Sequence, residues 1–124
     1  MSSPRIGLVG VGLMGHGIAL NIARKGFALT VLEHPGNQPL DALLALGVTT
    51  VNTVADLAAQ SYMLILCVTG SPQVESVLLG SDGSTGALAA LKSGTVVIDC
   101  STALPNSTEK IAQAVVAAGG ECLD

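Results

Sequence analysis

Hydrophobic residues in this chain fall into short segments with two different periodicities, separated by turns that contain glycine or proline. In one kind of segment most positions are apolar or β-branched, which is typical of a parallel strand that helices cover on both faces. In the other kind, apolar residues recur every three or four positions, which predicts an amphipathic helix. The strand-like segments span residues 6–11, 27–32, 48–51, 62–68 and 95–98, and a last one begins at residues 121–123.

Several helix boundaries are marked by residues with known terminal preferences. Gly26 and Gly47 each follow a helix-like segment, in the position where glycine commonly ends a helix. Thr53 and Asp56 have the spacing of a capping box, with Asp in place of the usual Glu, and they predict the start of another helix. The expected helices span residues 13–25, 40–46, 54–60, 71–79, 87–91 and 106–118, and a polar loop is expected at residues 81–86.

Strand and helix alternate along the whole chain without an internal repeat or a linker. This order predicts an α/β fold of the Rossmann type, a doubly wound parallel sheet with strand order 3-2-1-4-5-6 and helices on both faces. A length of 124 residues suits one domain with a hydrophobic core. Because a strand begins so close to Asp124, we expect residues 1–124 to be one domain of a longer protein.

Composition narrows the classes of partner. The net charge is −4, and the five basic residues form no long cluster. The chain therefore lacks a basic surface for nucleic acid, and with one Phe, one Tyr and no Trp it has few aromatic side chains on which bases could stack. The longest apolar run, residues 63–68, is too short to cross a bilayer, and no leader segment is visible, so we expect no membrane partner and a cytoplasmic location.

The cysteines and histidines do not predict a metal site. Cys67, Cys100 and Cys122 have no C-x-x-C spacing and lie in apolar, strand-like contexts, so we expect reduced core thiols without a metal or disulfide role. His16 and His34 are separated from each other and from any obvious ligand set.

The clearest candidate for chemistry is a glycine turn between the first predicted strand and the first helix. Gly10, Gly12 and Gly15 have the spacing G-x-G-x-x-G. In a dinucleotide-binding turn the first glycine allows the tight backbone, the second leaves room for the pyrophosphate, and the third lets helix and strand pack closely. The backbone N–H groups of Leu13, Met14 and Gly15 would then face the diphosphate at the helix start. The alternative is a tight strand–helix turn that binds nothing.

Residues at the ends of two further predicted strands fit the same site. Glu33 follows the second strand, 18 residues after Gly15, where a carboxylate commonly accepts hydrogen bonds from the adenosine ribose. Its charge would repel the 2'-phosphate of NADP, which favours NAD, although Glu33 also fits a solvated strand end. Cys67, Val68 and Thr69 end the strand that flanks the switch point, where ligands of open α/β sheets bind, although a wholly structural role also fits.

Three segments together resemble the N-terminal cofactor domain of the β-hydroxyacid dehydrogenases, a family that includes 3-hydroxyisobutyrate dehydrogenase, tartronate semialdehyde reductase and the related domain of 6-phosphogluconate dehydrogenase. The resemblance covers almost the whole chain and rests on residues 7–15, 64–80 and 97–105. The usual Met-Leu-Pro of the family is replaced by Cys67, Val68 and Thr69, and we expect this departure to alter the pocket wall beside the nicotinamide ribose. The resemblance also places Thr102 near the nicotinamide, whereas a hydroxyl that caps the turn before Pro105 is the structural alternative.

The resemblance implies a parent enzyme that transfers a hydride between NAD(P) and a small β-hydroxyacid or its semialdehyde. The serine-glycine-glycine substrate motif and the catalytic lysine of the family would lie beyond Asp124, so no catalytic residue is assigned within this chain. His34 occupies the place where NADP-preferring relatives tend to carry arginine, and a protonated His34 would partly offset the repulsion by Glu33. NAD is therefore the expected cofactor, with NADP as the alternative.

Two other functions remain open at this point. The chain could be a stand-alone nucleotide-binding or regulatory module without catalysis, whereas a methyltransferase that uses S-adenosylmethionine is disfavoured by the three-glycine spacing. If a second domain is missing, an apolar face would be exposed, and we expect the 124-residue chain to self-associate.

Overall fold

The computed structural model describes residues 5–10, 13–33, 40–68, 76–81, 84–91, 93–100 and 105–123. Its main feature is a six-stranded parallel sheet in the order β3-β2-β1-β4-β7-β8, which confirms the predicted Rossmann-type topology. The strands are β1 (Arg5–Val9), β2 (Ala28–Leu32), β3 (Thr49–Val51), β4 (Met63–Leu66), β7 (Val96–Asp99) and β8 (Glu121–Leu123).

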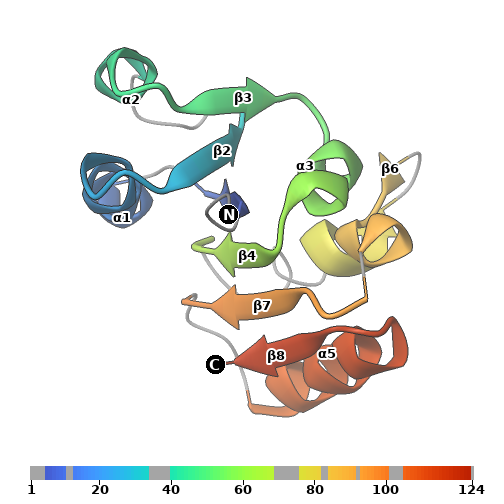
Figure 1. Cartoon of the computed structure of the whole chain (residues 1–124). Coiled ribbons are helices and arrows are strands. Elements are labelled where there is room, and N and C mark those ends of the chain that lie inside the picture. The colour runs from blue at the N-terminus through green and yellow to red at the C-terminus, as the bar shows by residue number, and fades with distance from the viewer. Residues whose placement is uncertain are drawn as a thin grey trace.

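Helices cover both faces of this sheet (Figure 1). On one face lie α1 (Leu13–Arg24) and α2 (Asp41–Ala45), and on the other lie α3 (Val54–Gln60), the 3₁₀ turn η1 (Ala87–Ala90) and α5 (Pro105–Ala117). Residues 76–79 form a further helical turn. None of the helices in the described ranges is long and apolar enough to cross a membrane.

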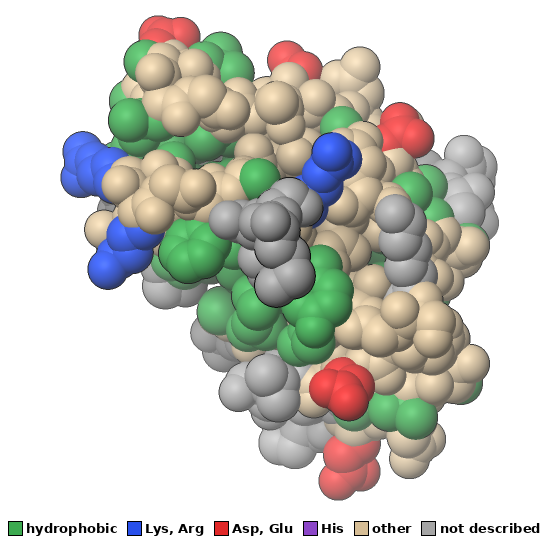
Figure 2. All heavy atoms as spheres, viewed as in Figure 1, with side chains coloured by type: hydrophobic (Ala, Val, Ile, Leu, Met, Phe, Trp, Pro, Cys, Tyr) green, Lys and Arg blue, Asp and Glu red, His purple; other side chains and the backbone are tan. Residues whose placement is uncertain are grey.

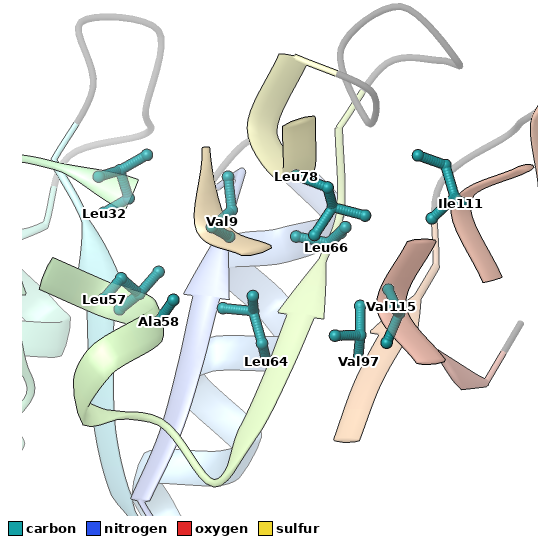
Figure 3. Packing of buried hydrophobic residues seen from close by; sticks show 11 residues of the cluster. Val9, Leu32, Leu57, Ala58, Leu64, Leu66, Leu78, Val97, Ile111 and Val115 are labelled. Atoms are coloured by element: carbon teal, nitrogen blue, oxygen red, sulfur yellow. The ribbon is translucent and has the colours of Figure 1, made fainter. Parts of the chain in front are cut away.

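The core has two parts, one on each side of the sheet, because successive strand residues point to opposite faces. Leu8 and Val31 pack toward α1 and α2, whereas Val9 and Leu66 pack toward α3 and α5. Figure 3 shows the second cluster, with Val115 of α5 beside Val97 of β7. The strands are therefore apolar on both faces, as the sequence predicted.

Local signals explain where several helices begin and end. The Thr53 hydroxyl accepts a hydrogen bond from the backbone N–H of Asp56 at 3.2 Å, which confirms the predicted cap of α3. Gly26 follows α1 with a φ of +86°, and its N–H donates to the carbonyl of Ala23 at 3.1 Å. A residue with a Cβ would resist this left-handed conformation, so glycine ends the helix here.

The sequence-based picture was wrong in two local details. Residues 81–86, expected as a loop, contain part of a small antiparallel hairpin formed by β5 (Gly80–Ser81) and β6 (Ser84–Thr85). A Cβ at Gly86 would lie on the Gly80 nitrogen and the Leu78 carbonyl oxygen, so the chain folds back closely at this glycine. The helix expected at 87–91 is a 3₁₀ turn.

Candidate functional site

The first residue of the glycine turn is held by contact with the end of β4. Gly10 follows β1 with a φ of +95°, a conformation that residues with side chains rarely adopt. A Cβ at Gly10 would lie on the carbonyl oxygen of Cys67 and 2.7 Å from its carbonyl carbon. Glycine is therefore required here both by the backbone angle and by the close approach of the neighbouring strand.

The third glycine brings the start of α1 onto this turn. Gly15 is buried in the first turn of α1, and a Cβ there would lie on the carbonyl oxygen of Gly10 and 3.1 Å from its carbonyl carbon. This close packing is the role that the sequence predicted for Gly15. Gly12 lies outside the described residues. The backbone of Leu13 and Met14 forms the start of α1, where unpaired N–H groups and the helix dipole favour an anion.

The strand ends that the sequence predicted to line the site do lie beside the glycine turn. The N–H of Cys67 donates to the carbonyl of Val9 at 2.8 Å, which places Cys67 directly next to the end of β1. Val68 lies 3.2 Å from a Cβ built at Gly10 and packs partly into the core. Thr69 lies outside the described residues.

Glu33 lies on the other side of the glycine turn, at the same edge of the sheet. Its N–H donates to the carbonyl of Val51 at 2.8 Å, and the residue is exposed. Leu8 pairs with Val31 in the register of β1 and β2, so Glu33 and Gly10 each stand two residues further along. The carboxylate is thus free of burial and placed beside the turn, as a ribose-binding residue requires. His34 lies outside the described residues.

The end of β7 adds residues that sequence reasoning did not assign to the site. Asp99 pairs with Leu66 and is 6% exposed, and the N–H of Cys100 donates to the carbonyl of Leu66 at 2.8 Å. Cys100 is exposed, which corrects the expectation that it is a core thiol, because it stands one residue beyond the buried part of its strand. Thr102 lies outside the described residues.

Burial raises the pKa of the Cys67 thiol above its ordinary value of 9.0, and the nearby negative charges of Cys100 and Asp99 raise it further. The neutral thiol is therefore favoured at Cys67. In the described ranges, no group of three or more histidine, cysteine or acidic side chains is placed to hold a metal ion.

The fold and this turn can be compared with known proteins. Residues 5–124 match the family described as the NAD binding domain of 6-phosphogluconate dehydrogenase. The chain belongs to this family. It is an NAD(P)-binding domain of the β-hydroxyacid dehydrogenase type, and the resemblance seen in the sequence is confirmed.

Individual relatives of this NAD(P)-binding domain are longer than the chain itself. It is 37% identical to 2-hydroxy-3-oxopropionate reductase of Escherichia coli (strain K12) and 32% identical to NAD-dependent L-serine dehydrogenase of Pseudomonas aeruginosa, in each case over 97% of this chain and 39% of the relative. The chain therefore spans about two fifths of the length of these relatives.

Solved structures agree with this assignment. The crystal structure of 3-hydroxyisobutyrate dehydrogenase from Salmonella typhimurium has a TM-score of 0.84 at 27% identity, covering 97% of this chain and 40% of that one. Psf3 in complex with NADP+ and 2-OPP has a TM-score of 0.80 at 27% identity, covering 94% of this chain and 40% of that one.

The described part of the site fits the phosphate-binding role of this family. Gly10 and Gly15 leave no room for side chains of their own, because a Cβ at Gly10 would lie on the carbonyl of Cys67 and a Cβ at Gly15 would lie on the carbonyl of Gly10. Such a backbone turn binds a diphosphate through N–H groups and the helix dipole, without a basic side chain.

Proposed function

We propose that the whole protein is an oxidoreductase that transfers a hydride between NAD(P) and a small β-hydroxyacid or its semialdehyde. The observation that carries this proposal is the packing of Gly10 against the end of β4 and of Gly15 against Gly10 in a chain of this NAD-binding family. The relatives named for 2-hydroxy-3-oxopropionate and L-serine support a small hydroxylated acid as the substrate.

Within this proposal, residues 1–124 bind and orient the cofactor and do not turn over substrate on their own. The nicotinamide supplies the hydride chemistry when the cofactor is bound. Orientation of the substrate and proton transfer are assigned to a second domain, because the substrate motif and the lysine expected from the family resemblance would follow Asp124. A stand-alone nucleotide-binding module is the alternative, and a gene that ends at Asp124 would favour it.

We further propose that NAD is preferred over NADP. Glu33 is exposed and stands level with Gly10, where its carboxylate can accept hydrogen bonds from a ribose. A 2'-phosphate on that ribose would place like charges next to each other, which disfavours NADP. A change of Glu33 to Gln removes the charge and keeps the size of the side chain.

The test is a paired titration of the chain with NADH and NADPH, followed by nicotinamide fluorescence. Glu33→Gln should weaken NADH binding about 3- to 10-fold, since an exposed charged hydrogen bond contributes roughly 1 kcal/mol, and it should strengthen NADPH binding. Glu121→Gln is the matched control, because Glu121 is also exposed but lies at the amino end of β8. Unchanged affinities in Glu33→Gln would contradict the preference, and no binding of either nucleotide to the 124-residue chain would contradict the assigned role of residues 1–124.

A further inference from the structure

Two cysteines that are far apart in the sequence follow neighbouring strands of the sheet. Leu66 and Asp99 are paired in the register of β4 and β7, and Cys67 and Cys100 are the next residues on each chain segment. The N–H of Cys100 donates to the carbonyl of Leu66 at 2.8 Å, which carries the parallel ladder one residue past the end of β7. The two cysteines therefore stand side by side at the carboxyl edge of the sheet.

The thiols also lie on the same face of the sheet. Ile65 pairs with Ile98, and both pack toward α1 and α2. Each cysteine is two residues further along, where side chains of an extended segment return to the same face, and Cys67 is indeed packed against that core cluster. Neighbouring strands are about 4.8 Å apart, which lies within the range of roughly 4.4–6.8 Å between the Cα atoms of disulfide-bonded residues.

The two thiols differ in their access to solvent. Cys100 is exposed, whereas Cys67 is half-buried. Burial raises the pKa of Cys67, and the charges of Cys100 and Asp99 add to this rise, so the neutral thiol is favoured at Cys67. Because the thiolate is the reactive form of cysteine, an oxidant in solution should react first with Cys100.

We propose that Cys67 and Cys100 form a redox pair that closes to an intrachain disulfide when Cys100 reacts with a hydroperoxide. The Cys100 thiol loses its proton, its thiolate attacks a peroxide oxygen, and the O–O bond breaks; Cys100 becomes a sulfenic acid, and the departing hydroxide or alkoxide takes up the released proton and leaves as water or an alcohol. Cys67 gives up its proton and attacks Sγ of Cys100, the S–O bond breaks, and the departing hydroxide takes up that proton and leaves as water. In total the two thiols lose two protons and two electrons, which reduce the peroxide.

The proposed disulfide would form beside the glycine turn, because a Cβ built at Gly15 lies 3.7 Å from the Cβ of Cys67. Its formation does not require that the turn binds a dinucleotide. A test on the protein without nucleotide therefore separates this proposal from the proposed function.

The third cysteine provides a control within the same sheet. Cys122 pairs with Val97 in the register of β7 and β8, and it packs against the opposite core cluster, toward α5. It is half-buried like Cys67, yet its side chain lies on the other face from the proposed pair.

The experiment treats the reduced chain with hydrogen peroxide and follows its intact mass. Trypsin then separates the three cysteines into different peptides, since cleavage after Lys25, Lys92 and Lys110 places them in residues 26–92, 93–110 and 111–124. We expect the intact mass to fall by two hydrogen atoms, a cross-link between the first two peptides, and full reversal by dithiothreitol.

The variants assign the order of the steps. Cys122→Ser should form the same cross-link, whereas Cys67→Ser should stop at a sulfenic acid on Cys100 that dimedone traps. In Cys100→Ser, the Cys67 thiol should be lost on the order of tenfold more slowly than the Cys100 thiol is lost in Cys67→Ser. A cross-link that involves Cys122, a disulfide between two chains, or sulfinic acid at Cys100 beside an intact Cys67 thiol in the unmodified sequence would each overturn the proposal.

Discussion

Gly15 and Gly17 are two glycines in the same helix whose replacement by alanine should have opposite effects. Both lie in α1, so alanine at either position gains helix propensity, about 0.5–1 kcal/mol. A Cβ at Gly17 would meet nothing within 4 Å, whereas a Cβ at Gly15 would lie on the carbonyl oxygen of Gly10. The difference between the two variants therefore isolates the steric contact.

The contact at Gly15 cannot be relieved by rotating a side chain, because the neighbouring atom belongs to the backbone of the turn. The start of α1 would have to move on the order of 1 Å, and overpacking of this kind costs about 1–3 kcal/mol. We expect Gly17→Ala to raise the free energy of unfolding by about 0.5–1 kcal/mol and Gly15→Ala to lower it by about 1–2 kcal/mol.

The same displacement should weaken cofactor binding. If two or three N–H groups at the start of α1 lose their alignment with the diphosphate, about 1–3 kcal/mol is lost, which corresponds to roughly 5- to 150-fold in affinity. Urea denaturation and NADH fluorescence titration of both variants provide the two readouts. Other dinucleotide-binding turns accept alanine at this third position, so the prediction depends on the close contact between Gly15 and Gly10 in this chain. If Gly15→Ala and Gly17→Ala have equal stability and bind NADH equally well, the steric argument is refuted.

Three further predictions concern stability and association. A Cβ at Gly7 would lie on the Ser61 hydroxyl, which donates to the carbonyl of Leu57 at 2.6 Å. In urea denaturation, Gly7→Ala should therefore lower the free energy of unfolding by about 1–3 kcal/mol. The double variant Gly7→Ala, Ser61→Ala should lose less stability than the sum of the losses in the two single variants. Burial raises the pKa of Cys67, so above pH 9.0 the Cys67 thiol ionises in the unfolded chain before it does in the folded chain, and the free energy of unfolding should fall as pH rises. Cys67→Ser should make this fall with pH less steep, and the same pH dependence in both proteins would contradict the prediction. Large hydrophobic residues such as Phe27, Tyr62 and Val116 are 45%, 55% and 64% exposed, and apolar side chains gather in the middle of the face shown in Figure 2. We therefore expect the chain to self-associate, so that the mass measured by light scattering rises with protein concentration. A constant monomer mass would count against self-association.

Much of the fold could be predicted from the sequence because its signals are local. The apolar strands, the Thr53 cap and the glycine helix ends each depend on a few neighbouring residues, and the order of strands follows from the right-handed alternation of strand and helix. The hairpin of β5 and β6 could not be predicted, because Gly86 packs against Leu78 and Gly80 through backbone atoms, a contact that leaves no hydrophobic pattern.

In the candidate site, the placement of Gly10, Gly15 and Glu33 near one another could be predicted for the same reason. Gly10, Gly15 and Glu33 carry a spacing that reflects the geometry of a strand, a turn and a second strand. The neighbourhood of Cys67 and Cys100 has no such spacing, since it depends on the register between β4 and β7. Given the predicted strand order, the signal in the sequence is the placement of both cysteines immediately after adjacent strands.

The contact between Gly10 and Cys67 also explains how the site tolerates its departure from the family pattern. The family resemblance implies methionine at position 67, where this chain has cysteine, yet the part of Cys67 that faces Gly10 is its carbonyl group. Any residue supplies that carbonyl, and the N–H that binds Val9 is equally independent of the side chain. The turn is therefore held by backbone, and position 67 can change its side chain without disturbing the glycine geometry. Because the glycine turn does not depend on the side chain at position 67, a cysteine there can take part in the proposed thiol pair without a change in the cofactor turn.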